Sequence, residues 1–176
     1  AEIANKIPNE IIEKVSEGLS IQEKEQFRVA MSYPIDSVGS HMDFEMISIR
    51  DNIKLEVVHR YLRRIDKFPP HTNKLFVVDR NNFLKGSLSL ENLLIKEPEV
   101  SVIHVMQKEI IFFNVKDKIE DVSLAFERYD LISAPVVDNN GRLIGRVIAS
   151  EIVDVIREEN DSEVLASVGL QHQEDI

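Results

Sequence analysis

The spacing of apolar residues changes near Gly39. Up to residue 33, apolar residues recur every three or four positions, which predicts two short helices between residues 9 and 33. Ser20 and Glu23 have the spacing of a capping box at the start of the second helix, and Pro34 marks its end. Because two helices alone bury little surface, we interpret them as the remnant of a helical domain. The residues expected to face inward in the second helix are Phe27, Ala30 and Met31.

A repeat occupies the rest of the chain. The stretch LFVVDRNNFLKGSLSLENLL (75–94) aligns without a gap on APVVDNNGRLIGRVIASEIV (134–153), and residues 42–58 resemble residues 106–123 less closely. Each copy predicts a strand, a helix, two strands joined by a tight turn, and a final helix. Units of about 60 residues bury their own sheets poorly, so we expect the two copies to pack as one pseudo-symmetric body.

Local patterns refine this repeat. Asp-Asn-Asn-Gly at 138–141 predicts a hairpin turn, since Asn and Gly tolerate positive φ. Gly145, inside the following strand, predicts a close approach of another backbone segment. FPPHTNK (68–74) lengthens the first copy and predicts an irregular loop. The apolar stripes expected on the first helix of each copy are Ile53, Val57 and Tyr61, and Ile119, Val122 and Phe126.

Composition narrows the classes of function. The formal net charge of −10 argues against binding duplex nucleic acid, which needs a Lys/Arg patch, and it favours cations or basic partners. The absence of Cys excludes disulfides and thiolate metal sites. No apolar run has the length of a membrane span, and the start lacks a signal-peptide pattern. The chain begins without Met in a helical pattern, so we interpret it as a fragment of a longer protein.

Sequence motifs of catalysis are missing as well. The five His residues show no zinc-site spacing, and neither a P-loop, a GxGxxG motif nor a serine-nucleophile motif occurs. We therefore do not expect an enzyme.

The segment IGRVIASEIVDVIREENDSEV (144–164) begins as an apolar strand and continues as a helix rich in carboxylates. Glu151, Asp154, Glu158 and Asp161 are spaced three, four and three residues apart, so they share one helix face. Like charges at this spacing cost about 0.2–0.5 kcal/mol per pair. Two interpretations stay open: a solvated helix face, or a site for a divalent ion such as Mg²⁺, which takes oxygen ligands and keeps several waters.

The tandem β-α-β-β-α repeat, with VVD and a strand glycine before each final helix, resembles a CBS (Bateman) pair. YPIDSVGSHM (33–42), VIHVMQKEII (102–111) and ERYDLISAPVVDNNGRLIGRV (127–147) further resemble the cytosolic region of MgtE-type magnesium transporters. The resemblance implies an α/β fold of two CBS units, preceded by a short all-helical stub and followed by the start of a connecting helix, which SEVLASVGL (162–170) resembles. The implied domains are a remnant of a helical N domain (1–35), CBS unit 1 (36–101), CBS unit 2 (102–159) and the start of the connecting helix to an absent membrane domain (160–176).

What the resemblance implies for function is cytosolic Mg²⁺ sensing. In that family, acidic surfaces bind Mg²⁺ when it is plentiful, the domains draw together, and the connecting helices hold the pore shut. The expected partners are a second copy, through the CBS units, and the N and transmembrane domains of the full-length protein. Neither nucleic acid nor direct membrane insertion is expected. The expected location is the cytoplasmic side of the cell membrane, with the fragment itself soluble.

The resemblance also implies metal ligands in the acidic helix and at Asp130. From the residues alone, Asp130 is more simply a helix-end or turn residue. Ser162 stands where the family often has an acid, and Lys118 replaces another acidic position beside Asp117. The implied Mg²⁺ ligands are Asp130, Glu151, Asp154, Glu159 and Glu163, with Glu120, Glu127 and Glu158 as secondary candidates.

Many CBS pairs bind adenine nucleotides between their units, with Ser or Thr and Asp after the strand glycine holding the ribose. Both copies depart from this pattern: the first has Gly86, Ser89 and Asn92, and the second has Gly145, Ile148 and Glu151. ATP is therefore an alternative ligand, with Ser89, Asn92 and Glu151 as candidate contacts. The alternative functions are a nucleotide-sensing CBS pair that regulates another partner, and a dimerisation scaffold.

Overall fold

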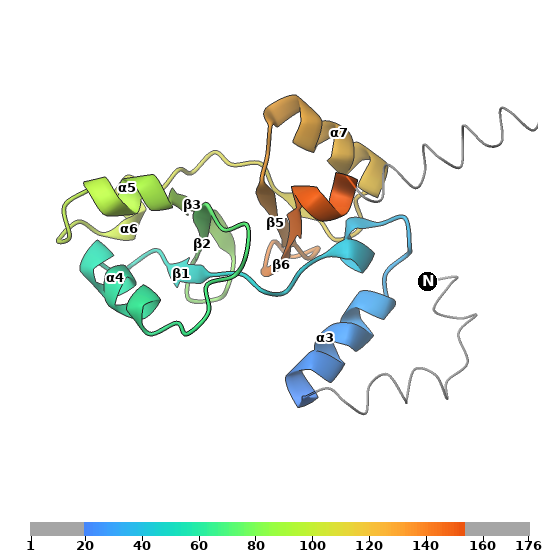
Figure 1. Cartoon of the computed structure of the whole chain (residues 1–176), viewed down its shortest axis with the longest axis horizontal. Helices are drawn as coiled ribbons and strands as arrows, with labels where there is room; N and C mark the ends of the chain where they lie inside the picture. The colour runs from blue at the N-terminus through green and yellow to red at the C-terminus, as the bar shows by residue number, and fades with distance from the viewer. Residues whose placement is uncertain (1–19, 154–176) are drawn as a thin grey trace, which may run out of the picture.

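The computed structural model describes residues 20–153 (Figure 1). Its first helix, α3 (Ile21–Met31), begins with the expected capping box, in which Ser20 and Glu23 satisfy each other's backbone N–H groups. The helix ends at Met31 with Ser32 as its C-cap, two residues before Pro34. No residue of α3 is fully buried, so its inward face is covered only in part. The expected helix before it lies outside the described residues.

The repeat folds into two similar units, as predicted. Unit 1 comprises β1 (Ser48–Arg50), α4 (Leu55–Arg63), β2 (Lys74–Val78), β3 (Leu84–Ser89) and α5 (Leu90–Ile95). Unit 2 comprises β4 (Phe113–Asn114), α7 (Ile119–Tyr129), β5 (Ser133–Val137), β6 (Leu143–Ile148) and a helical stretch at 149–153. The short helices η1 (Val38–His41) and α6 (Val102–Val105) precede the two units in the same way. Each unit has a three-stranded sheet in which the first pair is parallel and the second antiparallel.

The two hairpins have the same strand register. Val77 pairs with Gly86 in unit 1 and Val136 pairs with Gly145 in unit 2, and each ladder shifts directly after this pair. At the turns, Asp79 and Asp138 accept hydrogen bonds from backbone N–H groups two and four residues later. Residues that align without a gap in the two sequences therefore have the same strand register and the same turn hydrogen bonds.

Close packing explains the two strand glycines. A Cβ added to Gly145 would lie 2.7 Å from the Met42 side chain and 3.2 Å from the carbonyl oxygen of Asp43. A Cβ at Gly86 would collide with the carbonyl oxygen of Gln107. The close backbone approach expected at Gly145 is confirmed by the Asp43 carbonyl, and Gly86 lies closer still to a backbone carbonyl, that of Gln107.

Each unit has its own apolar core. In unit 2 the predicted stripe of Ile119, Val122 and Phe126 is buried, and the Phe126 ring stacks on Phe113 at 5.9 Å between centroids. In unit 1 the predicted stripe is wrong: Tyr61 is 47% exposed and Ile53 precedes the helix. Lys54 is the N-cap of α4, so the helix turns a different stripe inward. That stripe consists of Leu55, Val58 and Leu62.

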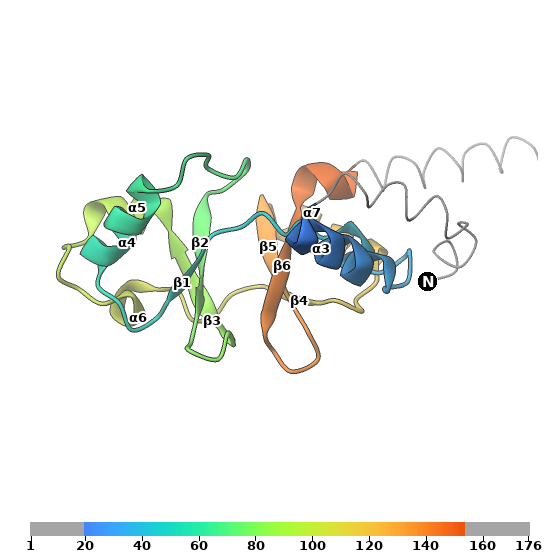
Figure 2. The same ribbon diagram turned by 90° about the horizontal axis from the view of Figure 1, so that it is seen from below.

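A third apolar cluster joins the units. Phe76 and Val78 of β2 pack with Leu143 of β6, and Met46 and Leu84 cover them. The N–H of Leu84 donates to the Gly141 carbonyl (3.1 Å), and the N–H of Leu143 donates to the Asn82 carbonyl (3.0 Å). Figure 2 shows the two hairpins side by side between the helices of the two units. The units therefore pack as one pseudo-symmetric body.

Within residues 20–153, no helix combines the length and the apolar character that crossing a bilayer requires.

Candidate functional site

The acidic candidates of unit 2 lie on α7 and after β6. Glu120 and Glu127 are exposed on α7, two turns apart on one face. Asp130 is the C-cap of α7 in the left-handed conformation (φ 51°), and its N–H donates to the Phe126 carbonyl. Within the described part of the chain, these three carboxylates form no ion pair. Glu151 is exposed in the helical stretch at 149–153.

Part of the predicted Mg²⁺ ligand set lies outside the described residues, namely Asp154, Glu158, Glu159 and Glu163. Among residues 20–153, no three His, Asp or Glu side chains lie close enough together to hold a metal ion. Mg²⁺ often binds through only one or two carboxylates and keeps its other ligands as water. The carboxylates of residues 20–153 therefore do not form a complete metal site among themselves.

An open cleft of about 350 Å³ lies between unit 1 and the segment that leads into unit 2. Ser89 and Asn92, two of the candidate nucleotide contacts, both line it, whereas Glu151 is not among its lining residues. The Ser89 hydroxyl accepts a hydrogen bond from the Asn92 N–H and so caps α5. The lining residues of this open cleft are Asn73, Lys74, Ser87, Ser89, Asn92, Gln107, Glu109, Ile110, Ile111 and Leu131.

Lys74 is the cationic side chain with an altered pKa in this cleft. It lies at the start of β2, and burial lowers the pKa of its ammonium group from the ordinary value. A partly desolvated cation beside Ser and Asn side chains can attract an anionic or polar group of a small molecule.

In unit 2 the position equivalent to Ser87 is occupied by Arg146. Ser87 of the open cleft exchanges two backbone hydrogen bonds with Gln107, and Arg146 exchanges the same two bonds with Asp43. Arg146 is only 1% exposed, and its guanidinium contacts Asp43, Pro70, His71 and Thr72. The two units therefore differ at this pair of equivalent positions: Ser87 lines an open cleft, whereas the Arg146 side chain is buried.

The comparisons with known proteins agree with this architecture. A family model described as the CBS domain matches residues 102–158. The magnesium transporter MgtE of Thermus thermophilus is 31% identical over 132 residues, which cover 75% of this chain and 29% of that protein. The crystal structure of the cytosolic domain of the Mg²⁺ channel MgtE in complex with ATP has a TM-score of 0.77 and 29% identity, and the match covers 81% of this chain and 58% of that one. The chain is a CBS pair of the MgtE type.

The fold of this CBS pair also matches a cystathionine beta-synthase pair domain from Shewanella oneidensis, with a TM-score of 0.76 over 90% of this chain and 92% of that chain. The predicted fold class and family resemblance are thus confirmed. The chain spans about a third of the length of the curated MgtE relatives that it matches.

Sequence reasoning missed two polar residues of the CBS pair, Lys74 and Arg146. The signal for Arg146 was its position inside the apolar strand LIGRVI, where a charge needs a buried partner. Lys74 precedes the apolar run LFVV in the same way. The partners of Arg146 could not be found from the sequence, because they lie in segments distant along the chain.

Proposed function

We propose that this CBS pair is a cytosolic, non-enzymatic regulatory region that senses Mg²⁺ for a magnesium transporter of the MgtE type. The similarity to the Thermus transporter over 75% of the chain is the observation that supports this proposal. In this proposal the domain boundaries follow those expected from the sequence, and the chain works on the cytoplasmic side of the membrane beside an N domain and a transmembrane domain.

The proposed mechanism is electrostatic. The exposed carboxylates Glu120, Glu127 and Asp130, together with those of the acidic helix, repel each other while Mg²⁺ is scarce. Bound Mg²⁺ offsets this repulsion and favours a closer arrangement of the domains. The ion can shift the equilibrium only as far as its affinities for the two arrangements differ.

A titration tests this proposal. Millimolar Mg²⁺ should reduce the radius of gyration in X-ray scattering and raise Tm, relative to NaCl of equal ionic strength. The double variant Glu151→Gln/Asp154→Asn should weaken both responses, whereas Glu97→Gln/Glu99→Gln, at exposed positions of unit 1, should not. An unchanged scattering curve and Tm in wild-type protein would refute Mg²⁺ sensing by this region.

The proposed assembly is a homodimer through the CBS units. Leu94 and Ile95 of α5 are 75% and 67% exposed, and Leu124 of α7 is 60% exposed. Apolar side chains grouped on helices are typical of a surface that a partner covers. Sedimentation equilibrium should give a dimer mass, and Leu94→Asp should shift it toward the monomer.

A second candidate function is the sensing of an adenine nucleotide, and the open cleft favours it. Lys74, Ser89 and Asn92 line this cleft, and the solved MgtE domain that the chain resembles holds ATP. Calorimetry with ATP, ADP and AMP tests this function. Micromolar binding that Asn92→Ala abolishes, without any Mg²⁺ response, would favour nucleotide sensing over Mg²⁺ sensing.

A further inference from the structure

One pair of equivalent positions in the two CBS units carries very different side chains. Ser87 and Arg146 occupy the same register position, opposite Phe76 and Pro135 respectively. The short Ser87 side chain lines the open cleft, whereas the long Arg146 side chain fills the corresponding space in the other half. One feature of the neighbouring loops is shared, since His71 and Asp130 occupy aligned positions and both have positive φ (57° and 51°).

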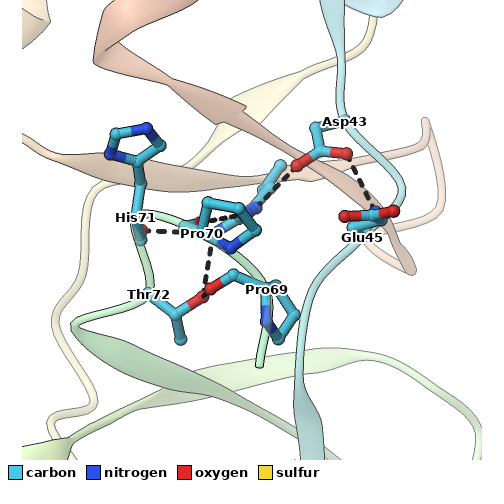
Figure 3. Close-up of polar contacts among 7 residues, drawn as sticks. Asp43, Glu45, Pro69, Pro70, His71 and Thr72 are labelled. Carbon is cyan, nitrogen blue, oxygen red and sulfur yellow. Dashed lines mark hydrogen bonds and ion pairs between the residues drawn. The ribbon is translucent and has the colours of Figure 1, made fainter. Parts of the chain in front are cut away.

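Four oxygen atoms accept hydrogen bonds from the guanidinium of Arg146, and we call them the oxygen cage. Figure 3 labels the residues that carry them, namely Asp43, Pro70, His71 and Thr72. Nε donates to Asp43 Oδ2 at 3.1 Å, and Nη2 donates to the Pro70 carbonyl at 2.7 Å. Nη1 donates to both the His71 carbonyl and Thr72 Oγ1 at 3.2 Å. The cage consists of one carboxylate, two carbonyls and one hydroxyl, so every member accepts a hydrogen bond.

The loop of unit 1 at residues 70–72 directs its acceptor oxygens toward Arg146. The Thr72 hydroxyl donates its own proton to the Pro69 carbonyl at 2.8 Å, which leaves its lone pairs directed at Arg146. The Asp43 carboxylate supplies the one negative charge that balances the buried cation. A planar guanidinium with five donors matches this arrangement, whereas an ammonium group would leave acceptors without a donor.

We propose that Arg146 is a built-in occupant of one of the two equivalent inter-unit positions, so that small molecules can enter the position at Ser87 but not the one at Arg146. Arg146 also ties the loop of unit 1 to β6 of unit 2. Without its side chain, the oxygen cage becomes a binding site for small guanidinium compounds. This inference goes beyond Mg²⁺ sensing and does not depend on it.

Chemical rescue tests the proposal, with methylguanidinium as the probe. Arg146→Ala should lower Tm by about 6–20 °C, because it leaves the partly buried Asp43 carboxylate without its cation and two carbonyls without their Arg146 donors. Methylguanidinium chloride at 10 mM should restore much of this loss, whereas 10 mM NaCl or ammonium chloride should not. Wild-type protein should show no such rise, and Arg146→Lys should melt closer to the Ala variant than to wild type. Calorimetry should show one methylguanidinium per Arg146→Ala chain and none per wild-type chain.

Either of two results would overturn the proposal: a Tm of Arg146→Ala within 1 °C of wild type, or a loss that methylguanidinium and NaCl restore equally. Where Arg146→Ala does not fold, Thr72→Val and Asp43→Asn keep Arg146 and remove one feature of the cage each. Both should lower Tm, whereas Ser87→Ala, at the equivalent position of the open cleft, should change it by less than either. Unchanged melting of both cage variants would equally refute the role of Arg146.

Discussion

At the residue scale, equal positions in the two copies have unequal neighbours. The repeat in the sequence predicts which residues pair across each hairpin, and the observed registers agree. The repeat does not predict which residues a long side chain such as Arg146 contacts. Arg146 contacts residues 43 and 70–72, and this proximity depends on how the two units pack. The local sequence pattern is thus sufficient to predict the strand register, but it is insufficient to predict the partners of a buried charge.

The strand glycines allow a matched comparison. Gly86→Ala places a methyl group against the rigid backbone at Gln107, whereas Gly145→Ala meets mainly the flexible side chain of Met42. Overpacking of this kind costs about 1–3 kcal/mol. We expect Gly86→Ala to lower the free energy of unfolding more than Gly145→Ala does, as measured by urea denaturation. Equal losses would show that the Gln107 segment moves as readily as Met42.

Asp79 gives a pH-dependent prediction. Partial burial acts to raise the pKa of its carboxyl, but the N–H groups of Phe83 and Asn81, followed by Lys85 and Arg50, together lower this pKa below the usual value. The folded state therefore gains stability from ionised Asp79 above pH 4, and this gain is lost as the pH falls through the lowered pKa. The difference in unfolding free energy between wild type and Asp79→Asn should shrink below about pH 4.

The control for this experiment is Asp66→Asn, at an exposed loop position. Its stability difference from wild type should stay small and nearly constant over the same pH range. A difference for Asp79→Asn that grows on acidification would contradict the lowered pKa.

At the scale of elements, the sequence is most informative where a strong local signal marks an end. The capping box at Ser20 and the hairpin turn at 138–141 are both observed. The predicted stripe of α4 is wrong because two series of apolar residues overlap in this segment. The series that begins at Ile53 was predicted, whereas the helix begins after its N-cap Lys54 and buries the series that begins at Leu55. Lys54 has no capping side-chain bond, so the sequence contained no strong signal for this start.

The cap of α5 provides a prediction that separates structure from ligand binding. Ser89 accepts the Asn92 N–H and also lines the open cleft. Ser89→Ala should lower the free energy of unfolding by about 0.5–2 kcal/mol, since an N-cap is lost. Ser89→Thr keeps the hydroxyl and should retain most of the stability in thermal and urea melts. A loss for Ser89→Thr as large as that for Ser89→Ala would mean that cleft shape, not capping, determines stability.

At the scale of the whole molecule, the small size of each unit predicted that the two copies pack together. The identity of the joining residues could not be predicted in the same way. Phe76 is buried between the units, yet its equivalent in the second copy is Pro135, so the repeat alone gives no symmetric contact. A complete metal site is equally hard to predict from the sequence. Mg²⁺ often binds only one or two carboxylates, and its remaining ligands come from water or from another domain.

The joining cluster makes the stability of one unit depend on the other. Leu143→Ala removes a side chain of unit 2 that packs on Phe76 and Val78 of unit 1, so we expect the free energy of unfolding to fall by about 2–5 kcal/mol. Leu84→Ala, at the equivalent position of unit 1, removes a partly buried side chain and should cost less. Calorimetry and hydrogen exchange provide the measurement: in Leu143→Ala, amide protection should decrease in β2 as well as in β6. Loss confined to unit 2 would show that the units fold independently and that their contact adds little.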